Sequence, residues 1–148
     1  MPEIFVEELV EAPVEKIYRI AQEIERFPEW MPNVKSVTIL SRRGETVTGR
    51  WVARVEEFKR TIRWIQEDVW DDAQHKCTFR ATEGDWDRYE GVWDFLPEEE
   101  KTRLQLRVNF EFNVPLIGPL VRGLLAKLVE KNSREMMQAL ARQAKESN

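Results

Sequence analysis

The sequence has few of the residues that form disulfides and most metal sites. It contains one cysteine, Cys77, and one histidine, His75, in 148 residues. A single cysteine cannot form an internal disulfide, which is compatible with a reducing compartment. A structural zinc ion needs about four thiolate or imidazole ligands, more than these two residues can supply. We therefore expect a cytoplasmic protein without a metal site.

Long apolar runs and phosphate-binding loops are also missing. No stretch of about 18 consecutive apolar residues occurs, and no charged and apolar leader precedes the first predicted strand, so we expect neither a membrane span nor secretion. None of the six glycines belongs to a phosphate-binding or dinucleotide-binding motif. We therefore expect no cofactor.

Positive charge is not in excess in this chain. The 23 lysines and arginines are interspersed with 27 acidic residues, which gives a formal net charge of -4. Nucleic acids bind clustered basic residues that neutralise their phosphates. We therefore expect no nucleic-acid partner.

The sequence does contain enough apolar material for one domain. Hydrophobic residues make up 42% of the 148 residues, and six of them are tryptophans. A chain of this length can bury a core of its own, so we expect residues 1–148 to form a single domain. Tryptophan side chains either fill a large core or line a cavity, and their number here favours some lining a cavity.

Alternation of apolar and polar residues predicts strands over much of the chain. In Thr102–Phe112 the even positions from Leu104 onward are apolar and the odd positions polar, as in a strand with one buried face. Short polar turns separate the successive segments from Val34 onward, which predicts antiparallel hairpins. The seven predicted strands are Ile4–Val10, Val34–Leu40, Thr46–Glu56, Thr61–Trp70, Lys76–Thr82, Trp86–Leu96 and Thr102–Phe112.

Helical periodicity marks three other segments. Val14–Ile24 follows Pro13, a residue that suits the start of a helix. Phe27–Pro32 contains two prolines and two aromatic residues, which predicts a short helical turn or a compact loop at one end of the sheet. Leu116–Ser147 has apolar residues at a helical spacing over its whole length, so we expect a long amphipathic helix that lies against the sheet.

Two stretches carry a resemblance to a known superfamily. Ala12–Tyr18, followed by Phe27–Val34, is similar to the opening of the START/Bet v 1-like (SRPBCC) superfamily, where the first strand gives way to two short helices. Tyr89–Pro97, followed by Thr102 and Phe110-Glu111, resembles the final hairpin of its polyketide cyclase/dehydrase and coenzyme Q-binding branch. The resemblance covers the whole chain and implies an α+β helix-grip fold, with a curved seven-stranded antiparallel sheet wrapped around the long C-terminal helix.

The same resemblance implies a cavity between the sheet and this helix. The expected ligand is a small hydrophobic molecule such as a lipid, an isoprenoid quinone or a polycyclic metabolite, which the protein binds and could also transport. The superfamily also includes polyketide cyclase/aromatase-type enzymes and protein-binding modules associated with ribosomes, and both stay open as alternatives. The predicted ligand-binding residues are Trp30, Trp51, Trp64, Tyr89, Trp93, Phe110, Leu124, Leu128, Asn132 and Met136.

Asp68 is the candidate for a catalytic group. If Trp64 and Trp70 point inward, then Gln66 and Asp68 on the same strand point inward with them. An interior carboxylate could transfer protons in a cyclase or dehydratase. A β-bulge would instead turn Asp68 outward and make it an ordinary surface residue.

Two further features have both functional and structural interpretations. Asn132 interrupts the apolar stripe of the long helix and is either a ligand contact or a structural hydrogen-bonding group. His75 and Cys77 share a strand face, but a nucleophilic pair would need an orienting partner that the sequence does not identify.

The segment Val114–Val129 is the candidate for a gate. Gly118, Pro119 and Gly123 interrupt its helical pattern, so it could open the cavity or make transient contact with a membrane, although simple packing is the alternative. The sequence leaves a monomer and a homodimer equally open.

Overall fold

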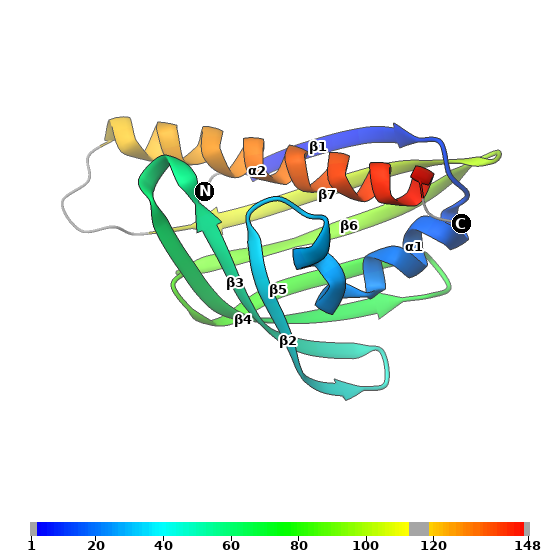
Figure 1. Ribbon diagram of the computed structural model, residues 1–148, viewed down its shortest axis with the longest axis horizontal. Coiled ribbons are helices and arrows are strands. Elements are labelled where there is room, and N and C mark those ends of the chain that lie inside the picture. The colour runs from blue at the N-terminus through cyan, green and yellow to red at the C-terminus, as the bar shows by residue number, and fades with distance from the viewer. Residues whose placement is uncertain (1–2, 113–118, 147–148) are drawn as a thin grey trace.

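A computed structural model describes residues 3–112 and 119–146, which form one antiparallel sheet and its covering helices (Figure 1). The elements in chain order are β1 (Glu3–Val10), α1 (Val14–Gln22), the 3-10 helix η1 (Ile24–Glu29), β2 (Val34–Arg43), β3 (Thr46–Val55), the 3-10 helix η2 (Glu56–Phe58), β4 (Arg60–Asp71), β5 (Lys76–Gly84), β6 (Arg88–Glu98), β7 (Lys101–Glu111) and α2 (Pro119–Glu146).

The sheet confirms the predicted helix-grip fold. Its seven strands lie in the order β1-β7-β6-β5-β4-β3-β2, and every neighbouring pair is antiparallel. The strands from β2 to β7 are joined as consecutive hairpins, as the short polar turns predicted. Only β1 pairs out of sequence, because it lies beside β7 at the far edge.

The long C-terminal helix lies across the inner face of this curved sheet (Figure 1). It packs against β1 and α1, and its buried residues include Leu128, Val129, Met137, Leu140 and Ala144. These residues recur at the spacing of one helix face. The apolar stripe that predicted α2 is therefore also the face by which the helix packs against the rest of the fold. The predicted start and end of this helix, Leu116–Gly118 and Ser147, lie outside the described residues, as does the Val114–Gly118 part of the predicted gate.

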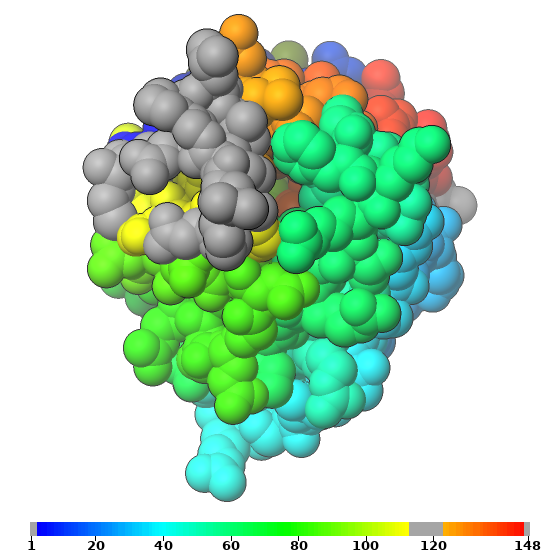
Figure 2. All heavy atoms as spheres, turned by 90° about the vertical axis from the view of Figure 1, so that its left-hand side faces the viewer, coloured from blue at the N-terminus to red at the C-terminus, as the bar shows by residue number. Residues whose placement is uncertain are grey.

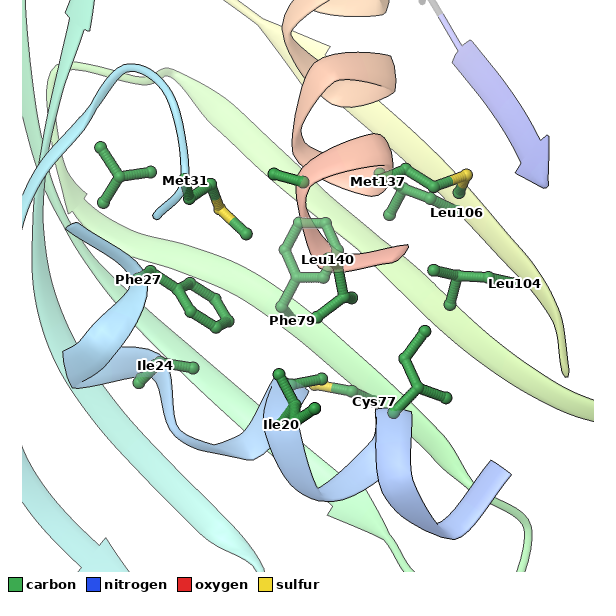
Figure 3. Packing of buried hydrophobic residues seen from close by; sticks show 14 of the residues in the cluster. Ile20, Ile24, Phe27, Met31, Cys77, Phe79, Leu104, Leu106, Met137 and Leu140 are labelled. Carbon is green, nitrogen blue, oxygen red and sulfur yellow. The ribbon is translucent and has the colours of Figure 1, made fainter. Parts of the chain in front are cut away.

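The core lies between α2, the first helices and the inner face of the sheet. Figure 3 shows Met137 and Leu140 from α2 pointing toward the same interior as Phe79 from β5 and Ile20 from α1. Phe95, Leu104 and other residues at alternate strand positions complete this core. The alternation of each strand therefore decides which side chains can reach the space beneath α2.

Register places three inner-face residues side by side across the sheet. Phe79 on β5 pairs with Asp68 on β4 and with Gly91 on β6. A Cβ atom at Gly91 would overlap the Arg107 carbonyl oxygen and lie 2.8 Å from Cζ of Phe79. Glycine is therefore required here, because the Arg107 carbonyl oxygen on β7 and the Phe79 ring both lie against the backbone of β6.

The described helices give no membrane span. Within residues 3–112 and 119–146, no helix is both long and apolar enough to cross a bilayer.

Candidate ligand-binding cavity

A cavity of about 130 Å³ lies between the inner face of the sheet and α2. Strands β3 to β6 contribute one wall, and α2 contributes Leu125, Leu128, Asn132, Ser133 and Met136 on the other side. Figure 2 shows one end of the molecule, where the turn containing η2 lies beside the first turns of α2. There Lys131 Nζ lies 2.7 Å from Glu57 Oε2, an ion pair that joins the two elements.

Aromatic rings form much of the sheet wall. Trp51 and Trp64 are stacked with their ring centroids 6.0 Å apart, and Trp86 is stacked on Tyr89 at 4.7 Å. Trp64 also meets Tyr89 edge-to-face at 5.7 Å, which joins the two stacks. Such large flat side chains give an apolar ligand a continuous surface to contact.

A chain of hydrogen bonds follows β4 along this wall. The Trp64 indole Nε1–H donates to Gln66 Oε1 at 2.9 Å, and Gln66 Nε2–H donates to Asp68 Oδ1 at 2.8 Å. The three residues are two positions apart and therefore share the inner face of the strand. A register shift does occur between Ile65 and Gln66, yet Asp68 still faces inward with 3% of its surface exposed.

Burial changes the ionisation of the groups around Asp68. Desolvation raises the pKa of Asp68 from its usual 3.8 to about 6, and the hydrogen bond from Gln66 opposes this rise. Burial, and then the nearby Asp68 charge, raise the pKa of the Cys77 thiol and of the Tyr89 hydroxyl. Asp68 is therefore the group in this cavity that titrates close to neutral pH.

Several polar groups on residues of the lining have no partner among the described residues. The indole N–H groups of Trp51 and Trp86 are buried without a hydrogen bond among the described residues. Within the same part of the chain, Gln66 is the only residue that hydrogen-bonds to the Asp68 carboxylate, and it contacts Oδ1 alone. The cavity therefore presents an acceptor that a bound molecule could satisfy, whereas the two indole nitrogens are enclosed by protein.

The structure places most of the predicted ligand-binding residues around the cavity. Those in its lining are Trp51, Trp64, Tyr89, Trp93, Leu128, Asn132 and Met136. That they bind a ligand stays a prediction.

The other three predicted residues lie outside the lining. Leu124 is 46% exposed, so its predicted inward position on α2 is wrong. Phe110 is buried in the core next to Trp86, and Trp30 packs against Phe27 at a ring distance of 5.2 Å. The alternation correctly predicted that Phe110 faces inward. It did not predict that Phe110 is packed in the core and does not line the cavity.

Trp86 lines the cavity but was not among the predicted ligand-binding residues. The sequence pattern assigned Trp86 to the strand that follows, where the alternation turned its side chain outward. The strand β6 begins only at Arg88, so this alternation does not extend to Trp86, whose ring lies over Tyr89 instead. Cys77, Phe79 and Ser133 also line the cavity, and the inward face of their elements was the signal for them.

His75 lies at the surface end of β5 rather than in the cavity. Its Nε2 atom is 3.2 Å from Glu15 Oε1, and its ring meets Tyr18 edge-to-face. The Tyr18 hydroxyl donates to Asp72 Oδ1 at 2.7 Å, which ties α1 to the same turn. These contacts give His75 a structural setting, whereas Cys77 is buried in the lining.

Metal-ligating side chains do not gather in the described residues. Within residues 3–112 and 119–146, no cluster of three or more His, Cys, Asp or Glu side chains is placed to hold a metal ion. The lack of a cofactor stays a prediction.

Comparison with known proteins identifies the family. Residues 10–137 match the family described as "Polyketide cyclase / dehydrase and lipid transport". The chain belongs to this family. The family relationship agrees with the predicted START/Bet v 1-like superfamily and with the helix-grip fold.

Three proteins are similar to this chain to different degrees. TTHA0849 from Thermus thermophilus is 36% identical, with a TM-score of 0.92 and 97% of each chain covered. The Zhui aromatase/cyclase from Streptomyces sp. R1128 has a TM-score of 0.89 at 19% identity, over 97% of this chain and 93% of the other, which shows a shared fold. The ribosome association toxin RatA of Escherichia coli K12 is 26% identical over 99% of this chain and 89% of its own.

Proposed function

We propose that this protein binds a small hydrophobic ligand in the cavity between its sheet and α2. The observation that carries this proposal is an aromatic cavity of about 130 Å³ whose lining includes the Asp68 carboxylate, with only one of its oxygens hydrogen-bonded among the described residues. Apolar surface removed from water would supply most of the affinity, at roughly 25 cal/mol per Å² before the costs of ordering. The family description, which includes lipid transport, supports the same function.

The test is a fluorescence titration with a panel of quinones, fatty acids and aromatic compounds. Tryptophans line the cavity, namely Trp51, Trp64, Trp70, Trp86 and Trp93, so an occupied cavity should change their emission. The variant Ser133→Leu adds a buried branched side chain to the lining and should abolish the change. Gln138→Leu places the same side chain on an exposed position of α2 and should leave binding intact.

The comparison of these two variants separates cavity binding from surface adsorption. If the wild type responds to no compound, or if Ser133→Leu binds as well as Gln138→Leu, the proposal is wrong. A folded protein in both variants, checked by circular dichroism, makes either result interpretable.

A second candidate function is catalysis of cyclisation or dehydration. Asp68 is buried in the cavity and its pKa is about 6, which suits a group that accepts and returns a proton near neutral pH. Turnover of a poly-β-carbonyl substrate that fell by about a hundredfold or more in Asp68→Asn would support this function. Ligand binding without any turnover would leave only the carrier function.

The location, the assembly state and the membrane contact of the protein are also proposals. We infer a cytoplasmic location, a monomer or homodimer, and membrane contact only during ligand exchange. Size-exclusion chromatography with light scattering distinguishes the two assembly states directly. A pull-down from ribosomal fractions tests the alternative of a ribosome-associated module, which RatA exemplifies.

A further inference from the structure

The cavity holds a carboxylate that nothing in the described part of the protein neutralises. Burial raises the pKa of Asp68, and the only opposing contribution comes from the neutral Gln66 amide. No cation contributes to the ionisation of this carboxyl among the described residues. A buried charge in this state is costly unless further hydrogen-bond donors reach it.

Only one of the two Asp68 oxygens is occupied. Oδ1 accepts the 2.8 Å bond from Gln66 Nε2, and Oδ2 has no hydrogen-bond donor within the described part of the chain. The Trp64 indole donates to the Gln66 oxygen and so fixes the amide with its Nε2 group at Oδ1, the one Asp68 oxygen that it contacts. The hydrogen-bond chain therefore holds Asp68 with an acceptor open toward the cavity.

The size of the cavity limits what can donate to this oxygen. The volume is about 130 Å³, close to the roughly 150 Å³ of an engineered cavity that binds benzene. One substituted aromatic ring therefore fits without opening the fold, whereas a lipid tail or a polycycle would require the cavity to widen. The stacked rings of Trp86 and Tyr89 offer a flat surface to such a ring.

Desolvation decides between the possible polar groups on that ring. A hydroxyl can donate to Asp68 and brings no charge into the cavity. An ammonium group also donates, but it carries a full charge. It would therefore have to lose far more hydration on entering an apolar cavity.

We propose that the ligand is a small phenol, one aromatic ring bearing a hydroxyl that donates to Asp68 Oδ2. This inference rests on the proposed binding function and specifies the chemical class of its ligand. Asp68 is then the residue that selects the ligand, and Gln66 is a positioning residue that holds the carboxylate in place.

The test compares ligands that differ only in the polar group. The probes are 4-ethylphenol, 4-ethylanisole, which has the oxygen without the donor, ethylbenzene and phenethylamine, measured by calorimetry at pH 7.5. Hydrogen bonds to a charged group lead us to expect that 4-ethylphenol binds about ten- to a hundredfold more tightly than 4-ethylanisole. Equal binding of these two would overturn the inference and leave the proposed function standing.

The Asp68→Asn variant tests the role of the carboxylate. The oxygen of the introduced amide can still accept from Gln66, which turns its N–H groups toward the cavity in place of an acceptor. The preference for 4-ethylphenol over 4-ethylanisole should therefore disappear. Glu67→Gln removes a carboxylate from the opposite face of the same strand and should keep the preference.

Lowering the pH should weaken the preference of the wild type for 4-ethylphenol over 4-ethylanisole. Protonation of Asp68 near pH 6 removes the charged acceptor. The other titratable groups in the lining are Cys77 on β5 and Tyr89 on β6, both with raised pKa values, and Arg54 on β3, while α2 contributes the neutral Asn132 and Ser133. Because the probe phenol has a pKa of about 10, a loss of preference between pH 7.5 and pH 5 reports Asp68.

Three other results would also overturn the inference. Tighter binding of phenethylamine than of 4-ethylphenol would overturn the phenol in favour of a cationic ligand. If Asp68→Asn still prefers 4-ethylphenol over 4-ethylanisole, another group recognises the hydroxyl, and the inference is also overturned. If none of the four compounds binds, both the inference and the proposed function for ligands of this size are wrong.

Discussion

Asp68 links the ionisation of the cavity to the stability of the fold. Its carboxyl has a pKa of about 6 when folded, against its usual 3.8, so the folded protein binds the proton more tightly than the unfolded chain. The stabilisation from this tighter binding is fully present below about pH 4 and is lost as the pH rises through 6. At neutral pH, burial of Asp68 therefore destabilises the protein.

Asp68→Asn should consequently raise stability at high pH. Relative to wild type, the free energy of unfolding should increase by up to about 3 kcal/mol at pH 8, the equivalent of about two pKa units. The gain should disappear at pH 4, where Asp68 is protonated in the folded wild type. Urea denaturation at both pH values measures the difference, and an equal effect at the two would show that ionisation is not its cause.

Gly91 is the second residue whose substitution should change the stability of the fold. A Cβ atom there would overlap a backbone oxygen of β7 that cannot move without disturbing the strand pair. Gly91→Ala should therefore cost at least about 2 kcal/mol, as overpacking does in other cores. Thermal or urea denaturation provides the measurement.

Gly123 supplies the matched control. It lies in α2, where an added Cβ would have no atom within 4 Å among the described residues. Gly123→Ala should leave stability unchanged or raise it by up to about 1 kcal/mol, because alanine favours helix. Similar losses in both variants would contradict the packing argument.

Residue-level prediction from sequence succeeded where alternation is regular. Asp68 and Gln66 were expected to face inward because Trp64 and Trp70 on the same strand do. The open oxygen of Asp68 could not be predicted, since it depends on which oxygen Gln66 engages. Trp86 was missed because its position depends on a strand beginning two residues later than the pattern suggested.

At the scale of elements, α2 is held by its buried face rather than by its ion pairs. Met137 and Leu140 are almost fully buried against the core, whereas Lys131, which contacts Glu57 and Glu135, is exposed. Exposed ion pairs contribute little because water screens them. The apolar stripe therefore determines whether the helix stays on the sheet.

Two variants of α2 separate these contributions. Met137→Ala should lower the free energy of unfolding by about 2 to 5 kcal/mol, and Lys131→Ala by less than about 1 kcal/mol. Urea denaturation at low and high salt measures both. A large, salt-sensitive loss in Lys131→Ala would show instead that the bridge to η2 is a principal attachment of the helix.

The sequence predicted the existence and type of these elements more reliably than their ends. Periodicity identified α2 because its stripe is long, yet it assigned Leu124 to the buried face, where the structure leaves it exposed. The stripe is buried from Leu128 onward, which a count of apolar residues cannot reveal, because it depends on how far the sheet extends beneath the helix.

At the scale of the whole molecule, ligand binding should stabilise the fold. A molecule that binds only the folded state adds about 2.7 kcal/mol at a hundredfold excess over its Kd. For a domain of this size, that corresponds to a rise in melting temperature of about 5 to 10 °C. Differential scanning fluorimetry with 4-ethylphenol measures the rise, which should be absent in Ser133→Leu.

The pairing of β1 with β7 has a consequence for how the chain is made. Glu3 lies opposite Asn109, so the first strand has no sheet partner until the residues of β7 have left the ribosome. Until then its apolar face, Ile4, Val6 and Val10, has no core to cover it. Pairings so distant in sequence fold slowly. During synthesis, the chain is therefore most exposed to aggregation and to chaperones at its own first strand.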